Sequence, residues 1–387
     1  MNESEYVPKL IECIEKQSFK DFELYACVNQ LEHWWEDAEK QNICIDNAKT
    51  IEILTNIKSF EVEIIDRSSK GNGWDAKNFG VGWARKTVMD KIASIADDKD
   101  IIICLDGDIS FNDNYFQSVI DAFEKAPKAM GMTIPYYHKL TNDNTNNKAL
   151  LRYEIYMRNY ELNMWKIKSP YSYTAIGSAM ACPVWAYKKV RGIAPKTSGE
   201  DFYFLQKLRK AGSIIVYNHE KIYPSSRLSD RVFFGTGPAL IKGTKGDWSS
   251  YPIYHYSLFK NIKKLYDSFS LLFTNDIKTP LDAFIQECFG ENIWNALRKN
   301  YKTEEAFVKA CHHKIDGLRI LQYLKSEQKK MNIRDEQALQ ENIAWLFPKK
   351  IIDVSINNGS VESLNIVRDF MAEEEMAIRI VVNVLIC

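Results

Sequence analysis

The stretch Ile101-Ile102-Ile103-Cys104-Leu105-Asp106-Gly107-Asp108 joins a run of five apolar residues to two carboxylates. The apolar run is typical of a strand that is buried on both faces, as in a parallel sheet. Ligands collect at the carboxyl ends of strands in open α/β sheets, and alternate residues of an extended segment point the same way. Asp106 and Asp108 can therefore face one ligand, and a divalent cation that carries phosphate oxygens suits such a pair. A solvated turn is the simpler interpretation of the same residues.

The composition is that of an ordinary globular protein. Its 387 residues allow one large domain and a smaller one. Lys+Arg and Asp+Glu both number 51, so no overall charge favours nucleic acid as a partner. The eight cysteines form no Cys-x-x-Cys pair, which indicates buried thiols in a reducing compartment. No signal peptide or apolar segment of ~20 residues is visible, so we expect no transmembrane helix and a cytoplasmic protein, free or peripheral at the inner membrane face.

The spacing of apolar residues divides the chain into two parts. Over residues 1–245, expected strands alternate with expected helices, which predicts a mainly parallel α/β sheet flanked by helices. Over residues 246–387, apolar residues recur at three- and four-residue spacing, which predicts a mostly helical C-terminal region. Within it, residues 378–386 are rich in β-branched side chains and predict a final strand.

Three motifs follow one another in the first part. Gly80-Val81-Gly82-Trp83-Ala84-Arg85-Lys86 opens a predicted helix, Asp106-Gly107-Asp108 ends the strand, and Gly199-Glu200-Asp201 opens a later helix. This order resembles the family 2 glycosyltransferases over roughly residues 2 to 240. The resemblance implies the Rossmann-like GT-A fold and a metal-assisted, inverting sugar transfer of the hexosyltransferase type in glycan biosynthesis. The donor would be a UDP-, GDP- or dTDP-linked sugar, and the acceptor a glycan or a lipid-linked molecule.

The resemblance also implies roles for individual residues. Asp201 would be the general base, and Glu200 would orient the base or the acceptor. Asp106 and Asp108 would hold Mn²⁺ or Mg²⁺, a Lewis acid for the departing diphosphate. Gly177 and Ser178 would border the acceptor. The expected donor-binding residues are Asn29, Asp66, Arg85, Asp106, Asp108, Arg227 and Arg231. For Glu200 and Asp201, capping of a helix N-terminus is the simpler alternative.

Two departures from the family pattern affect these roles. Asn29-Gln30 stands where relatives commonly carry acidic residues that meet the nucleobase, and Asp66 is the nearest substitute. Many relatives also place a metal-ligating histidine about two dozen positions after the base, where this chain has Arg227. The metal would then have few protein ligands, or Arg227 and Arg231 would stabilise the diphosphate directly. A structural salt bridge is the alternative for both arginines.

A third departure concerns a strand. Relatives begin with an apolar strand immediately before the Asn-Glu found here at residues 2 and 3, and this chain starts after it. Loss of a central strand leaves its neighbours with unpaired backbone groups. We hypothesise that residues 378–386 fill the vacant place, in the same molecule or by strand exchange in a homodimer. A start further upstream is the alternative.

Two other classes of protein stay open. A strand that ends in Asp-x-Asp also suits a haloacid-dehalogenase-like phosphohydrolase, with Asp106 as phosphoryl acceptor, although those enzymes usually carry the motif near the start of the domain. A non-catalytic sugar-nucleotide-binding or scaffold protein would use the C-terminal helices for partners. The altered Asn29-Gln30 and the absent histidine favour the scaffold, and the retained Asp108 and Asp201 oppose it.

Overall fold

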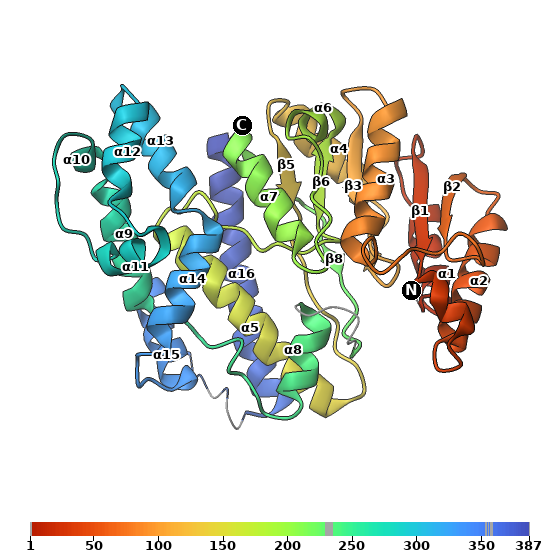
Figure 1. The fold of residues 1–387 in the computed structure, drawn as a ribbon. Coiled ribbons are helices and arrows are strands. Elements are labelled where there is room, and N and C mark those ends of the chain that lie inside the picture. The colour runs from red at the N-terminus through yellow and green to blue at the C-terminus, as the bar shows by residue number, and fades with distance from the viewer. Residues whose placement is uncertain (1, 229–234, 353, 355, 357–358, 387) are drawn as a thin grey trace. The chain divides into compact units, whose positions relative to one another are not determined.

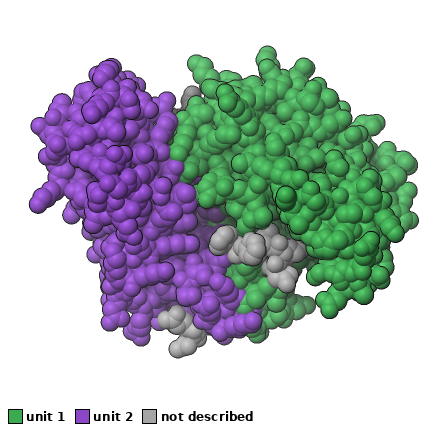
Figure 2. All heavy atoms as spheres, in the orientation of Figure 1, with its two compact units in different colours: residues 1–146, 175–241, 379–387 green, residues 147–174, 242–378 purple. Residues whose placement is uncertain are grey.

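The computed structural model describes residues 2–228, 235–352, 354, 356 and 359–386. The chain folds into two compact units, which Figure 2 distinguishes by colour. Unit 1 comprises Met1–Asn146, Ala175–Ile241 and Arg379–Cys387, and unit 2 comprises Asn147–Thr174 and Lys242–Ile378. Unlike the division expected near residue 245, each unit is therefore assembled from more than one segment of the chain.

Unit 1 alternates strands with helices, as the sequence predicts (Figure 1). Its strands are β1 (Glu23–Asn29), β2 (Glu61–Arg67), β3 (Ile101–Cys104), β4 (Ser110–Phe111), β5 (Gly131–Thr133), β6 (Met180–Pro183), β7 (Ile214–Ile215) and β8 (Ile222–Tyr223). Its helical elements are α1 (Val7–Glu15), the 3₁₀ turn η1 (Glu32–Glu36), α2 (Gln41–Thr55), α3 (Val81–Ile95), α4 (Tyr115–Lys125), α6 (Val184–Lys189) and α7 (Glu200–Ala211). Helices α5 (Asn144–Lys166) and α8 (Thr236–Gly243) begin in unit 1 and end in unit 2.

The strands of unit 1 form three sheets. β1 and β2 pair in parallel, β4 and β8 form a short antiparallel ribbon, and the order of the four-stranded sheet is β3-β6-β5-β7. All residues of the inner strands β5 and β6 are buried, as expected for strands covered on both faces. The α/β class is confirmed, but the four-stranded sheet is mixed because β6 runs antiparallel to both β3 and β5.

Residues 378–386 are helical, so the prediction of a final strand is wrong. They form the end of α16 (Val361–Ile386). Arg379 is 1% exposed, and its Nη1 donates to the carbonyl oxygen of Val216 at 2.5 Å within unit 1. Docking through one helix face outweighs the β propensity of isoleucine and valine. Across the described parts of the chain β1 pairs only with β2 and β3 only with β6, so strand replacement and strand exchange both lose their basis.

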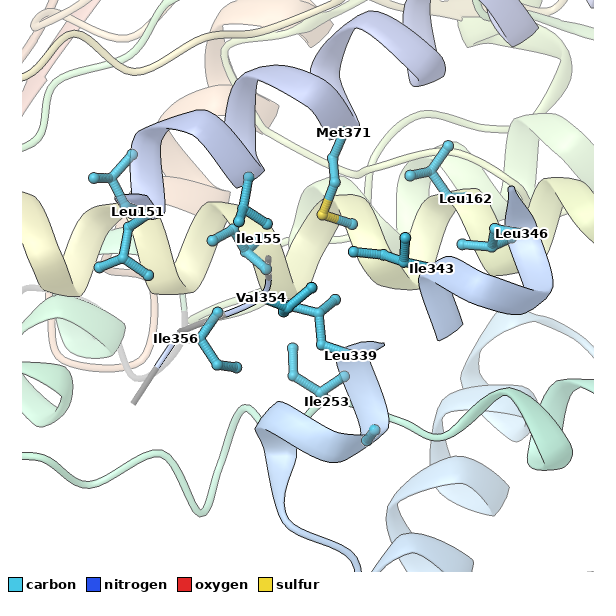
Figure 3. Packing of buried hydrophobic residues seen from close by; sticks show 13 residues of the cluster. Leu151, Ile155, Leu162, Ile253, Leu339, Ile343, Leu346, Val354, Ile356 and Met371 are labelled. Carbon is cyan, nitrogen blue, oxygen red and sulfur yellow. The ribbon is translucent and has the colours of Figure 1, made fainter. Parts of the chain in front are cut away.

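Unit 2 is built from helices, as the apolar spacing predicts. They are α9 (Tyr256–Asp267), α10 (Phe269–Thr274), α11 (Asp282–Phe289), α12 (Ile293–Asn300), α13 (Glu304–Lys314), α14 (Gly317–Gln328), α15 (Asp335–Leu346), most of α5 and the first part of α16. Side chains of α5, α15 and α16 converge on one apolar cluster, in which Ile155, Ile343 and Met371 are buried (Figure 3). None of the helices described here combines the length and the apolar character that a membrane span needs.

Candidate active site

Most of the predicted site residues come together in unit 1. Asp106 and Asp108 follow β3, Arg85 lies in the first turns of α3, and Glu200 and Asp201 open α7. The apolar strand β3 ends at Cys104, so the polar residues beyond it leave the sheet at its carboxyl end. Asn29 and Asp66 lie apart from this group, at the ends of β1 and β2. Arg231 lies outside the described residues.

The guanidinium group of Arg85 links two of the three motifs. Its Nη2 donates to Oδ1 of Asp106 at 2.8 Å, and its Nη1 donates to Oε1 of Glu200. The Arg85 side chain is 8% exposed. Burial disfavours its charge, but the carboxylates of Asp106 and Glu200 outweigh burial and raise the pKa of Arg85. One buried cation therefore ties the helices α3 and α7 to the end of β3.

Gly177 makes room for this cation. A Cβ atom at residue 177 would lie 2.5 to 2.8 Å from the three terminal guanidinium atoms of Arg85. Ser178, the other predicted acceptor residue, is 2% exposed. The glycine is explained by the arginine beside it, and contact of either residue with an acceptor stays a prediction.

Asp201 has the protonation behaviour that the base role needs. Burial, followed by the neighbouring charge of Glu200, raises the pKa of its carboxyl group to about 7 against the opposing charge of Arg85. Oδ1 of Asp201 accepts a hydrogen bond from the backbone N–H of Phe202 at 2.7 Å, in the first turn of α7. The helix terminus thus holds Asp201 in place while the group stays able to exchange a proton near neutral pH.

A second guanidinium group lies at Asp108. Nε of Arg227 is 2.8 Å from Oδ2 of Asp108, and Nη2 donates to Oε1 of Glu3 at 2.5 Å. The Arg227 Cζ atom lies 4.4 Å from the ring centroid of Tyr6. Burial lowers the pKa of Arg227, but Asp108 and Glu3 outweigh it and raise the pKa. Glu3 is not among the site residues predicted from the sequence, although Asn2-Glu3 belongs to the stretch that resembles the start of the family's domain.

Asn29 and Asp66 lie at neighbouring strand ends, one register step apart, because β1 and β2 pair with Val28 opposite Asp66 and Asn29 opposite Arg67. Burial would raise the pKa of Asp66, but hydrogen bonds from Ser69, Ser68 and Asn72 lower it to about 2. Asp66 therefore stabilises its own loop as an ionised group. Asn29 is 7% exposed, and within the described part of the chain its Oδ1 has no hydrogen-bond donor. A buried acceptor without a donor is costly, which suits it to a ligand N–H.

The charges near Asp106 and Asp108 decide whether a divalent cation fits. The described cluster contains five carboxyl groups, of Glu3, Asp106, Asp108, Glu200 and Asp201, against the guanidinium groups of Arg85 and Arg227. Among the described residues, no three of the His, Cys, Asp or Glu side chains are placed so that together they could hold a metal ion. The Asp106 side chain is nevertheless 41% exposed, and Mg²⁺ usually binds one or two carboxylates together with phosphates and water. The donor set fits a cation that arrives with a diphosphate.

Comparison with known protein families gives a match over just under half of the chain. Residues 1–182 match the family model described as glycosyl transferase family 2. No curated protein matches the chain. The matched part contains Asp106-Gly107-Asp108 and stops before Asp201 and Arg227. Residues 1–182 therefore support a family 2 glycosyltransferase.

Proposed function

We propose that this glycosyltransferase transfers a sugar, with inversion, from a nucleoside-diphosphate sugar to an acceptor hydroxyl. The observation that carries the proposal is the Arg85 bridge, which joins Asp106 on the donor side to Glu200 beside Asp201. The acceptor oxygen attacks the anomeric carbon as the bond from that carbon to the diphosphate breaks. Its proton passes to Asp201, whose pKa of about 7 allows a large fraction of the carboxylate at neutral pH.

On the donor side, we assign Asp106 and Asp108 to the diphosphate and its cation. Mn²⁺ or Mg²⁺ would supply Lewis-acid stabilisation of the charge that develops on the departing diphosphate. Arg227 would add guanidinium hydrogen bonds to phosphate oxygens, and we assign the same role to Arg231, which lies outside the described residues. The buried Oδ1 of Asn29, which has no donor among the described residues, would accept a hydrogen bond from an N–H of the nucleobase.

The identities of the sugar and the acceptor rest on family resemblance. A hexose on UDP, GDP or dTDP is the expected donor, and a glycan or a lipid-linked acceptor would lie near Gly177 and Ser178. The described cysteines are all free, which supports a reducing compartment such as the cytoplasm.

The test is turnover of a small panel of UDP-, GDP- and dTDP-sugars with Mn²⁺, measured as release of the nucleoside diphosphate. We expect turnover of at least one donor. Asp201→Asn should keep nucleotide affinity within about twofold and lower kcat by roughly 10²–10⁴-fold, because only the proton acceptor is lost. Asp108→Ala should lower nucleotide affinity in the presence of Mn²⁺.

Each outcome bears on a separate part of the proposal. Near-normal turnover by Asp201→Asn would show that the base is assigned wrongly. Nucleotide binding without turnover, unchanged by Asp201→Asn, would support a binding or scaffold protein. Release of phosphate from simple phosphomonoesters would instead support a phosphohydrolase.

A further inference from the structure

The position of Arg227 conflicts with a metal that binds Asp108 on its own. The same carboxylate that is assigned to the cation already lies 2.8 Å from Nε of Arg227. We propose that Arg227 is an internal counter-cation that competes with the metal for Asp108 and transfers to the diphosphate when the donor binds. Metal and nucleotide then bind cooperatively, and the metal binds weakly alone. The inference rests on the proposed donor site.

The side chains around Arg227 stabilise a positive charge at this position. The guanidinium lies between the carboxylates of Asp108 and Glu3, and the Tyr6 ring lies 4.4 Å from its Cζ. The side chains of Arg227, Asp108 and Glu3 are 17%, 16% and 14% exposed, so water screens these charges only in part. Nη2 of Arg227 makes a charge-assisted hydrogen bond to Glu3, and the ring face adds a cation–π attraction. The Asp108 contact is an ion pair, in which Nε has no hydrogen-bond partner among the described residues.

A divalent cation at Asp108 changes the electrostatic balance around Arg227. The cation and the guanidinium repel each other and need the same carboxylate, so metal binding has to displace the Arg227 contact or weaken it. A diphosphate supplies new acceptor oxygens, and a guanidinium pairs well with phosphate. Because coupling between two ligands is reciprocal, a nucleotide that engages Arg227 must raise the affinity for the metal by the same factor as the metal raises the affinity for the nucleotide.

The other arginine of the site provides a contrast. Arg85 is 8% exposed and is enclosed by Gly177, and its partners Asp106 and Glu200 lie on two separate elements. Moving it would open the connection between β3 and α7. Arg227 also joins two elements, at Asp108 after β3 and at Glu3 before α1, but its side chain is 17% exposed against 8% for Arg85, and it contacts the carboxylate that is assigned to the metal. Arg227 is therefore the arginine that is suited to exchange partners.

The test measures binding of Mn²⁺ alone to the full-length protein, by the electron paramagnetic resonance signal of free Mn²⁺. Arg227→Gln should bind Mn²⁺ roughly tenfold or more tightly than the wild type, because a charge-assisted competitor is gone. Arg227→Lys should gain less, because the ammonium keeps the charge but cannot span two carboxylates. Arg334→Gln, which removes an exposed guanidinium in unit 2, should leave Mn²⁺ affinity unchanged. Adding Asp108→Asn to Arg227→Gln should abolish the gain.

A second titration of Mn²⁺ in the presence of UDP, GDP or dTDP measures the coupling. In the wild type the preferred nucleotide should tighten Mn²⁺ binding by a larger factor than in Arg227→Gln. Equal or weaker Mn²⁺ binding by Arg227→Gln, with Arg227→Lys also unchanged, would overturn the proposal. Failure of every nucleotide to bind would count against the donor site itself, while the titration with Mn²⁺ alone would still decide the role of Arg227.

Discussion

Each unit of the molecule buries arginines between carboxylates, and the two clusters differ in balance. In unit 2, α5 and α16 contribute two carboxylates and two guanidinium groups, from Glu154, Arg158, Arg368 and Glu375. Arg158 lies 2.6 Å from Glu154 and 2.6 Å from Glu375, and Arg368 lies 3.3 Å from Glu154. None of the four side chains is more than 3% exposed. Among these four buried side chains the charges of opposite sign are equal in number, and Arg368 also lies 2.9 Å from Asp369, whose side chain is 39% exposed.

The cluster of unit 1 has the opposite character. Its described carboxyl groups outnumber its guanidinium groups by five to two, and the Asp106 side chain is 41% exposed. Asp201 also has a pKa of about 7, which marks a carboxylate that its surroundings destabilise. Buried charges that balance satisfy one another, whereas an open cluster with excess acid is most stable when an outside cation joins it. We therefore propose a structural role for the cluster of unit 2 and a binding role for the cluster of unit 1.

We expect the greatest loss of stability when a cation is removed from the buried cluster of unit 2. Arg158→Met leaves Glu154 and Glu375 buried with too little positive charge, which should cost about 3–5 kcal/mol of the free energy of unfolding. The loss should be visible as a lower denaturation midpoint and as faster hydrogen exchange in α5 and α16. Below the melting temperature, nucleotide affinity should not change.

The matched control for that substitution is Arg334→Met, which removes an exposed guanidinium from the same unit. It should change stability by no more than about 0.5 kcal/mol. If Arg158→Met proves equally harmless, the buried cluster does not hold α5 to α16, and the structural half of the comparison is wrong.

The Asp-Gly-Asp motif was predictable because its causes are local. Five apolar residues make β3, and the polar residues that follow must leave the sheet where its ligands collect. The partners of Arg85 were not predictable in this way. Asp106 and Glu200 lie 21 and 115 residues away in the chain, and no spacing rule relates positions so distant. The same holds for Arg227 and Glu3, which are 224 residues apart.

The error over residues 378–386 has a different cause. Isoleucine and valine favour strands in general, but their measured preference depends on the surface they pack against. Here the segment continues α16, and Arg379 finds a buried carbonyl partner on Val216. A window of nine residues contains neither the preceding helix turns nor that partner. The helical C-terminal region was predicted correctly because its apolar spacing extends over many turns.

A substitution of Arg85 tests the functional role of the cluster in unit 1 and should have a smaller effect. Arg85 lowers the pKa of Asp201, so Arg85→Gln should move the acidic limb of the kcat–pH profile above pH 7. At pH 7 we expect kcat to fall roughly tenfold, because less of the base is ionised. Raising the pH to about 8.5 should restore part of the rate, and Arg85→Lys, which keeps the charge, should shift the profile less. A rate that falls equally at all pH values would indicate lost geometry and would count against electrostatic control of Asp201.

The smallest effect concerns stability, and it follows from the sign of the Asp201 shift. The folded carboxyl has a pKa of about 7, whereas an unfolded aspartate has one of about 3.9. Between these pH values the folded state keeps a proton that the unfolded state has lost, so the free energy of unfolding falls as pH rises from 4 to 7. Asp201→Asn removes this titration and should raise Tm by roughly 2–4 °C at pH 8.

The same variant should differ much less from the wild type at pH 4, where the folded aspartate holds nearly all of its proton and the unfolded one roughly half. Glu154 offers the contrast within one molecule. Glu154→Gln should lower Tm at pH 8, because this carboxylate is paired with Arg158 and Arg368. The two substitutions should therefore change Tm at pH 8 in opposite directions. This result is expected if the excess carboxylates of unit 1 serve a ligand, whereas those of unit 2 hold α5 and α16 together.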